Sequence, residues 1–207
     1  RDKNIVERFL NEARIARKMA HPNVVRVHDI GNANGVVYIS MEFLEGRSLR
    51  NVLDSLPPGQ RMPLRDVLTV FDQLCASLEY AHQFTVHRDI KPENVMLCGD
   101  GTVKLMDFGI SKLMANTRLT NASIVMGTPF YMSPEQLRNS RDVDARADIY
   151  SVGVMLYEVL TDNMPTGVPK AASELVRGIP AELDHIVKRC VEPDPKDRYQ
   201  DAIELRT

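Results

Sequence analysis

Two short stretches of the sequence carry polar side chains in an order that could support chemistry. Residues 87–94 read HRDIKPEN, so Asp89, Lys91 and Asn94 place a carboxylate, an ammonium group and a carboxamide within six residues. Asp107 opens a second stretch, DFG, at residues 107–109. This set suits phosphoryl transfer, in which catalysis depends on positioning the reactants and neutralising developing charge. One carboxylate can accept the proton of an attacking hydroxyl, while the carboxamide and the other carboxylate are hard oxygen ligands, which Mg²⁺ prefers.

Helices and strands must position these two stretches. Apolar residues recur at helical spacing over Leu64–Gln83, so residues 87–94 should lie on a loop just after a helix. Two short strands, Val95–Leu97 and Val103–Leu105, flank a turn at residues 99–101. The same patterns predict a first helix at Ile5–Met19, strands at Val24–Ile30 and Val36–Met41 joined by a turn at residues 31–35, and helices near Ala145–Leu160, Ala181–Cys190 and Gln200–Leu205.

The composition is that of an ordinary globular domain. The 207 residues are 43% hydrophobic, which is enough for a sizeable core. A formal net charge of -2 gives no electrostatic support for binding nucleic acid or an anionic membrane, because both favour basic surfaces. We expect no membrane segment, since no window of about 18 clean apolar residues exists. Three cysteines without a C-x-x-C pair favour reduced thiols and a cytoplasmic location.

Five motifs with matching order and spacing resemble those of the eukaryotic-type (Hanks-type) Ser/Thr protein kinases, and the bacterial members of that family most of all. In chain order they are MEFL at 41–44, HRDIKPEN at 87–94, DFG at 107–109, GTPFYMSPE at 127–135 and DPKDR at 194–198. The resemblance implies an α+β fold with two lobes. An incomplete small lobe would span residues 1–41, a hinge residues 42–44, and a mainly helical large lobe residues 45–207.

The resemblance also implies an activity, which is transfer of the γ-phosphoryl group of ATP to Ser or Thr hydroxyls of a protein substrate with Mg²⁺. By this match Asp89 would be the catalytic base and Lys91 would contact the phosphate. Asn94 and Asp107 would bind Mg²⁺. Lys91, and Thr128 with the glycine before it, mark Ser/Thr rather than Tyr specificity in this family.

An adenine pocket follows from the same resemblance. Met41 would be the gatekeeper residue, the backbone of Glu42 and Leu44 would hydrogen-bond adenine, and Met96 would form the floor. Glu12, on the first predicted helix, would pair with a strand lysine of the nucleotide site. Both methionines would equally serve as core residues, because an adenine pocket is itself an apolar core.

Other motif residues are expected to stabilise or regulate the fold. Asp148 and Arg198 match structural anchors of the family, and Glu135 would form a buried bidentate pair with Arg198, because a buried charge needs a partner. A phosphorylated residue would gather three cations, since a phosphate of about -1.5 to -2 charge can bind several basic side chains. The cations implied by the family are Arg8, Arg88 and Lys112, and the acceptors expected for autophosphorylation are Thr120 and Ser123.

The sequence departs from the family pattern in two places. It contains no G-x-G-x-x-G loop and no strand lysine to pair with Glu12, which favours a truncated chain that begins just before the first predicted helix. Residues 161–179 are short and rich in Pro and Gly, where the family usually has a substrate-docking helix.

Alternative interpretations remain for the residues and for the function. Asp89 and Asn94 could merely cap turns, and Glu12 could form a local ion pair with Arg8. The missing lysine is compatible with a pseudokinase or scaffold that binds partners without transferring phosphate. A small-molecule kinase of the aminoglycoside-phosphotransferase type shares the Asp…Asn spacing, but it lacks the arrangement that begins at Lys91 and the segment at residues 127–135.

Overall fold

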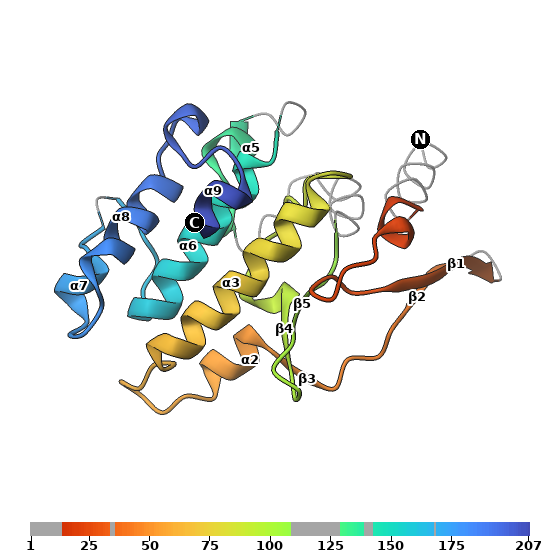
Figure 1. The fold of residues 1–207 in the computed structure, drawn as a ribbon, viewed down its shortest axis with the longest axis horizontal. Helices are drawn as coiled ribbons and strands as arrows, with labels where there is room; N and C mark the ends of the chain where they lie inside the picture. The colour runs from red at the N-terminus through yellow and green to blue at the C-terminus, as the bar shows by residue number, and fades with distance from the viewer. Residues whose placement is uncertain (1–13, 34–35, 109–128, 139–142, 168) are drawn as a thin grey trace.

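The computed structural model describes residues 14–33, 36–108, 129–138, 143–167 and 169–207. Their architecture is α+β, as the sequence predicts. One antiparallel sheet pairs β1 (Val27–Ala33) with β2 (Val36–Met41), and a second has the order β3 (Gly46–Ser48), β4 (Val95–Cys98), β5 (Val103–Leu105). Figure 1 shows the β1–β2 ribbon extending from one side of the molecule, while most of the helices gather on the other side.

The segment before β1 contacts the second sheet. Residues 14–18 are helical, so the helix ends one residue before the predicted end at Met19. The part of this predicted helix before Arg14, with Glu12, lies outside the described residues. The predicted strand start at Val24 is wrong, because Val24 forms only a single parallel bridge with Leu105 of β5. The Val25 N–H also donates to the Leu105 carbonyl at 3.0 Å. This contact draws the segment into the core, and regular pairing with β2 begins only at Val27.

Strand β1 continues through residues that the sequence pattern assigns to a turn. Gly31, Asn32 and Ala33 all pair with β2, and Ala33 lies opposite Val36. A Cβ atom added at Gly31 would lie 2.3 Å from Cζ and from the hydroxyl oxygen of Tyr38. The glycine thus leaves room for the Tyr38 ring to lie across β1, although a glycine at this point of the sequence resembles a turn signal.

Two short elements at residues 46–54 have no counterpart in the sequence prediction. Strand β3 is followed directly by helix α2 (Leu49–Asp54). Ser48 ends the strand and caps the helix, because its Oγ accepts a hydrogen bond from the Asn51 N–H at 3.1 Å. Gly46 lets β3 approach β4, since an added Cβ would lie 2.3 Å from the Leu97 carbonyl oxygen.

The longer helices follow the apolar periodicity closely. They are α3 (Leu64–Ala81), α6 (Arg146–Thr161), α8 (Ala181–Cys190) and the shorter α9 (Ala202–Arg206). Two further short helices, α5 (Pro134–Arg138) and α7 (Ala172–Leu175), were not predicted. Between α6 and α8, the described residues form only the one-turn α7, in the stretch where the sequence departs from the family pattern.

Helix α6 lies at the centre of the core and is buried on nearly every side, as expected for a helix that is apolar all round. Ile149 and Met155 of α6 are fully buried, as are Leu74 and Leu78 of α3. Burying each such side chain stabilises the fold by about 1.5–3 kcal/mol. No helix among the described residues is both long and apolar enough to cross a membrane.

Candidate active site

The loop after α3 brings three of the predicted catalytic residues into contact. The Lys91 Nζ atom donates to Asp89 Oδ2 at 2.8 Å. The Asn94 Nδ2 atom donates to the same oxygen at 3.1 Å and to the Asp89 carbonyl at 2.8 Å. A 3-10 turn at Pro92–Asn94 folds the loop back so that Asn94 reaches Asp89. The Asp89 side chain is partly exposed, so its carboxylate is fixed in place yet accessible to a hydroxyl group.

Asp107 follows β5 and lies beside this loop. The Met106 N–H donates to the Asn94 carbonyl at 2.9 Å, which brings the start of the DFG stretch next to Asn94. Asp107 has a φ of 59°, in the left-handed region that non-glycine residues seldom adopt. Such backbone strain is commonest at active sites and ligand-binding positions.

The donor set around Asn94 fits a magnesium ion. Because Asn94 directs its amide nitrogen at Asp89, its Oδ1 is the atom that a cation would use. A carboxamide oxygen and the Asp107 carboxylate, together with phosphate oxygens of a nucleotide, match the few protein ligands that Mg²⁺ usually takes. The described residues contain no group of three or more His, Cys, Asp or Glu side chains that could hold a metal ion.

A fully buried aspartate of α6 fixes the backbone of the catalytic loop. Asp148 Oδ2 accepts from the His87 N–H at 2.8 Å, and Asp148 Oδ1 accepts from the Arg88 N–H at 2.7 Å. The His82 Nε2 atom lies 2.9 Å from Oδ2. Burial raises the pKa of Asp148, but its hydrogen bonds and the neighbouring histidines outweigh burial and hold that pKa below its ordinary value. The structural role predicted for Asp148 is confirmed.

Sequence reasoning assigned no role to His82 or His87, and both belong to this network. The fully buried His87 has Nε2 at 2.7 Å from the Met106 carbonyl, and its Nδ1 accepts from the Asp89 N–H at 3.2 Å. Nε2 therefore carries the proton, and burial lowers the pKa of His87 so that the ring stays neutral. The ring also packs on Phe108, with centroids 4.6 Å apart. No spacing rule could have identified the contacts with Asp148 and Met106, because they join residues distant in sequence.

The predicted pair of Glu135 and Arg198 is present and bidentate. Arg198 Nη1 and Nη2 donate to the two carboxylate oxygens of Glu135 at 2.7 and 2.9 Å. The Arg198 side chain is fully buried, and burial of the Glu135 carboxyl is outweighed by this partner, which lowers the pKa of Glu135. The pair ties α5 to the segment after α8.

The predicted hinge residues lie between the two sheets. Met41 ends β2, and the Glu42 N–H donates to the Arg26 carbonyl at 2.9 Å. The Glu42 carboxylate accepts from Lys104 Nζ at 2.7 Å. Lys104 in turn lies opposite Met96 in the β4–β5 pairing, so the contact places the predicted hinge beside the predicted floor. Leu44 lies in the extended segment that follows.

Several predicted residues lie outside the described part of the chain. They are Glu12, Thr128, Arg8, Lys112, Thr120 and Ser123. The contacts predicted for them stay predictions. Of the three predicted phosphate-binding cations, only Arg88 is described, and its Nη2 donates to the Val143 carbonyl at 3.4 Å.

A second polar network, missed in the sequence, adjoins the catalytic loop. Arg50 of α2 donates to Glu93 Oε1 at 3.3 Å, to Glu158 Oε1 at 2.7 Å and to the Tyr131 hydroxyl at 2.8 Å. The Tyr131 hydroxyl donates to Glu158 Oε2 at 2.5 Å. Burial lowers the pKa of Arg50, but the carboxylates outweigh it and raise that pKa overall. Arg50 thus joins α2, the catalytic loop, α6 and the segment after residue 128.

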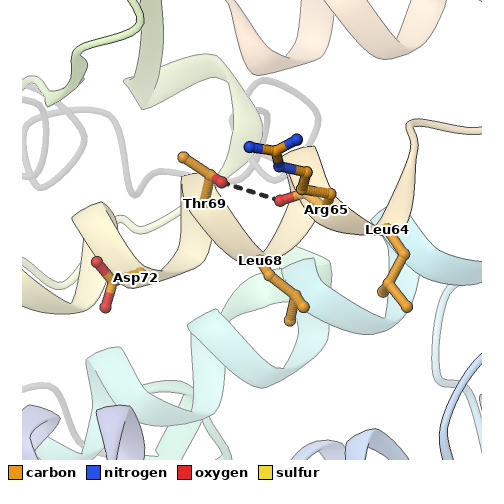
Figure 2. A pocket seen from close by; sticks show the side chains of 5 residues that line it. All are labelled: Leu64, Arg65, Leu68, Thr69 and Asp72. Atoms are coloured by element: carbon orange, nitrogen blue, oxygen red, sulfur yellow. Dashed lines mark hydrogen bonds between the residues drawn. The ribbon is translucent and has the colours of Figure 1, made fainter.

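A surface depression on α3 is a poor candidate for the reaction site. Its lining comes from one helix, as Figure 2 shows, and consists of Leu64, Arg65, Leu68, Thr69 and Asp72. Thr69 bonds back to the Arg65 carbonyl at 2.9 Å, which is an ordinary contact within a helix. None of the predicted catalytic residues lines it.

Comparisons with known proteins show which family the chain resembles. The family model for the protein kinase domain matches residues 1–204. The serine/threonine-protein kinase PknB of Mycobacterium leprae is 37% identical, over 100% of this chain and 36% of its own length. The tyrosine-protein kinase MasK of Myxococcus xanthus is 39% identical, over 96% of this chain and 34% of its own length. The chain thus spans about a third of the length of these relatives.

A solved structure shares the fold. The kinase domain of PknI from Mycobacterium tuberculosis superposes with a TM-score of 0.80 at 30% identity, covering 98% of this chain and 77% of that one. The two-lobe α+β fold predicted from the motifs is therefore confirmed, and neither the scaffold nor the small-molecule kinase interpretation is favoured. The chain belongs to the protein kinase family.

Proposed function

We propose that the protein phosphorylates Ser or Thr hydroxyls of protein substrates with Mg·ATP, and that Asp89 is the catalytic base. One observation carries the proposal: the Asp89 carboxylate is held by Lys91 and Asn94 on a loop whose backbone is fixed by Asp148. Merely capping a turn would not require an ammonium group and an amide to converge on one carboxylate oxygen. The scaffold interpretation gives no reason for this arrangement.

In the reaction, the Asp89 carboxylate accepts the proton of the substrate hydroxyl. The hydroxyl oxygen forms a bond to the γ-phosphorus, the bond from that phosphorus to the β,γ-bridging oxygen breaks, and ADP leaves. Lys91, 2.8 Å from Asp89, supplies positive charge next to the γ-phosphoryl oxygens as their charge redistributes. Asn94 restrains Asp89 by binding its carboxylate and its carbonyl.

Asn94 and Asp107 are the residues that would hold Mg²⁺. When bound, the ion neutralises phosphate charge and orients the nucleotide. Asn94 suits this position because its amide nitrogen is bonded to Asp89, which fixes the side-chain orientation that presents Oδ1. The backbone contact between Met106 and Asn94 keeps Asp107 nearby.

We assign adenine to the segment at residues 42–44, between a small lobe at 1–41 and a large lobe at 45–207. The Glu42 N–H and carboxylate are used within the protein, so the Glu42 carbonyl and the Leu44 N–H are the groups proposed to bind adenine. Met41 would be the gatekeeper and Met96 the floor. Glu12 would pair with the nucleotide-binding lysine that the family carries on a strand.

The proposal also covers which hydroxyl groups are phosphorylated and where in the cell the protein works. PknB carries a serine/threonine name and MasK a tyrosine name, so identity alone does not separate the classes. Lys91 and Thr128 match the Ser/Thr pattern, and Thr120 or Ser123 would be autophosphorylated. The free thiols of the three cysteines support a reducing, cytoplasmic setting.

The decisive experiment uses residues 1–207 together with any sequence that flanks them in the gene. This protein is incubated with radiolabelled ATP and Mg²⁺. Label should appear on Ser and Thr, and mass spectrometry should find it at Thr120 or Ser123. Asp89→Asn should lower kcat by roughly 10²–10⁴-fold while nucleotide affinity stays the same, because Asp89 acts in the chemical step.

A matched control is Asp100→Asn, the same chemical change on the exposed turn between β4 and β5. That variant should retain parental turnover. Label confined to tyrosine would overturn the Ser/Thr assignment, and parental kcat in Asp89→Asn would overturn the assignment of the base.

A further inference from the structure

The residue before the proposed base has an unfavourable backbone conformation. Arg88 has a φ of 66°, in the left-handed region that residues with a side chain avoid. Such a conformation persists only where surrounding contacts hold it. The orientation of Asp89 therefore depends on the groups that hold the backbone of Arg88.

Three contacts hold the backbone here, and they come from different parts of the chain. The Arg88 N–H donates to Asp148 Oδ1 at 2.7 Å. The peptide group that joins Arg88 to Asp89 is held on both sides: its N–H donates to His87 Nδ1 at 3.2 Å, and its carbonyl accepts from Gln136 Nε2 at 3.0 Å. Gln136 has no role in the reaction described above.

Hydrogen bonds hold the side-chain amide of Gln136 in a single orientation. It is buried, and its Oε1 accepts from the N–H of Ser133 at 3.1 Å and from the Ser133 hydroxyl at 3.3 Å. A backbone N–H can only donate, so the amide oxygen must face Ser133 and the amide nitrogen must face the Arg88 carbonyl. Ser133 is fully buried, which leaves this amide little freedom to turn.

We propose that Gln136 is a positioning residue for phosphoryl transfer, which holds the Arg88–Asp89 peptide so that the Asp89 carboxylate faces the substrate hydroxyl. Gln136 adjoins Glu135, which Arg198 anchors, so the end of the segment at residues 129–136 is bonded directly to the peptide of the base. The inference rests on the proposed role of Asp89. It adds a residue that acts through Asp89 without touching substrate or nucleotide.

The test compares three variants of the full-length protein. Gln136→Met keeps the length of the side chain and removes the donor, so kcat should fall by about 10- to 100-fold, as expected for a misplaced reactive group. KM for ATP should stay within about twofold of the parent, because the proposed nucleotide contacts lie elsewhere. Gln136→Glu keeps an acceptor for Ser133, removes the donor to Arg88, and should lower kcat similarly.

Ser133→Ala is the matched control, because it removes a hydroxyl from the same cluster but keeps the amide donor to Arg88. It should retain parental kcat. Parental kcat in both Gln136 variants would reject the inference, and so would an equal fall in kcat for Ser133→Ala.

A double variant separates positioning from general damage. If Gln136 acts through Asp89, adding Gln136→Met to Asp89→Asn should change the residual single-turnover rate by less than about twofold. A further tenfold loss would mean that Gln136 acts independently of Asp89 and would overturn the proposal. The proposal would also be overturned if both Gln136 variants melted more than about 10 °C below the parent, because Gln136 would then mainly stabilise the fold.

The same assays distinguish a failure of the positioning role of Gln136 from a failure of the proposed role of Asp89. An inactive Asp89→Asn with fully active Gln136 variants rejects the positioning role alone. A fully active Asp89→Asn rejects the base and, with it, the residue proposed to position the base.

Discussion

Arg198 directs all five of its N–H donors at protein acceptors while its side chain is fully buried. Besides the two Glu135 oxygens, it donates to the carbonyls of Glu192, Arg146 and Pro193 at 2.7, 3.0 and 3.1 Å. Its guanidinium also lies over the Tyr150 ring, 4.9 Å from the centroid. A buried charge is tolerated only when its donors are satisfied, and this site satisfies all of them.

Lysine cannot reproduce this geometry, because an ammonium group has three donors and no planar fork. We therefore expect Arg198→Lys to destabilise the protein nearly as much as Arg198→Ala, by about 3–5 kcal/mol. The corresponding fall in Tm is roughly 10 °C or more for a chain of this size, measured by calorimetry. Arg189→Lys is the control, since Arg189 forms an exposed pair with Glu204. A tolerated Arg198→Lys, with Tm within a degree or two of the parent, would contradict the argument.

At the scale of elements, length and the presence of a flanking turn decided what the sequence could predict. The apolar pattern predicts the bounds of β5 and α8 and the start of α3 correctly. In the two helices the apolar face repeats over several turns, and β5 is preceded by a clear turn signal. Strand β3 and helices α2, α5 and α7 span too few residues to show a period. The motifs placed Asp89, Asn94 and Lys91 together correctly, because those residues lie on one short loop.

Residues that reach the site from afar were not predictable. Gln136 lies 48 positions from Arg88 and His82 lies 66 from Asp148, so only the packing of α5 and α6 brings them together. Arg50 reaches Glu158 across 108 positions. Their residue types are common on helix surfaces, and no local pattern marks them as members of a site.

The contact between α6 and α8 allows a prediction about an element interior. Gly153 lies inside α6, where alanine would normally favour the helix by about 1 kcal/mol. A Cβ at Gly153 would, however, lie 2.3 Å from Cys190 Cβ, so the helices would have to move apart. Overpacking of this kind costs about 1–3 kcal/mol, and at this distance we expect the upper part of that range.

Gly153→Ala should therefore lower the free energy of unfolding by about 1–2 kcal/mol, measured by urea denaturation. Gly99→Ala is the matched control, because nothing lies within 4 Å of a Cβ added there. The control should be neutral or slightly stabilising. A stabilised Gly153→Ala would show that helix propensity outweighs the clash and would contradict the packing argument.

At the scale of the whole molecule, one buried and two partly buried carboxyl groups join elements that are distant in the sequence. Asp148 joins α6 to the loop, Glu135 joins α5 to the segment after α8, and Glu42 joins the predicted hinge to β5. For each carboxyl, burial alone would raise the pKa, but its partners outweigh burial and lower the pKa overall. His87 is buried in its neutral form, and burial lowers its pKa.

These shifts determine how stability should depend on pH. A group whose pKa is lower in the folded than in the unfolded state contributes stability above its unfolded pKa and loses that contribution as the pH falls. For His87 the loss begins below its ordinary value of 6.5, because the buried neutral ring must become charged or the protein must unfold. For Glu42 and Glu135 it begins near 4.5, and for Asp148 near 3.8. The loss of folding stability with falling pH should therefore have two stages.

We expect Tm, followed by circular dichroism, to fall slightly between pH 6.5 and 5 and steeply below about pH 4.5. Glu135→Gln should have a Tm well below that of the parent at pH 7, because Arg198 then lacks a charged partner. As the pH falls below 4.5, the parent progressively loses the stability supplied by the charged Glu135, until the carboxyl is protonated in the folded state as well. The difference in Tm between parent and variant should therefore narrow. A difference that stays constant from pH 7 to 3.5 would show that the charge of Glu135 contributes nothing to stability, and that its contacts with Arg198 depend on shape alone.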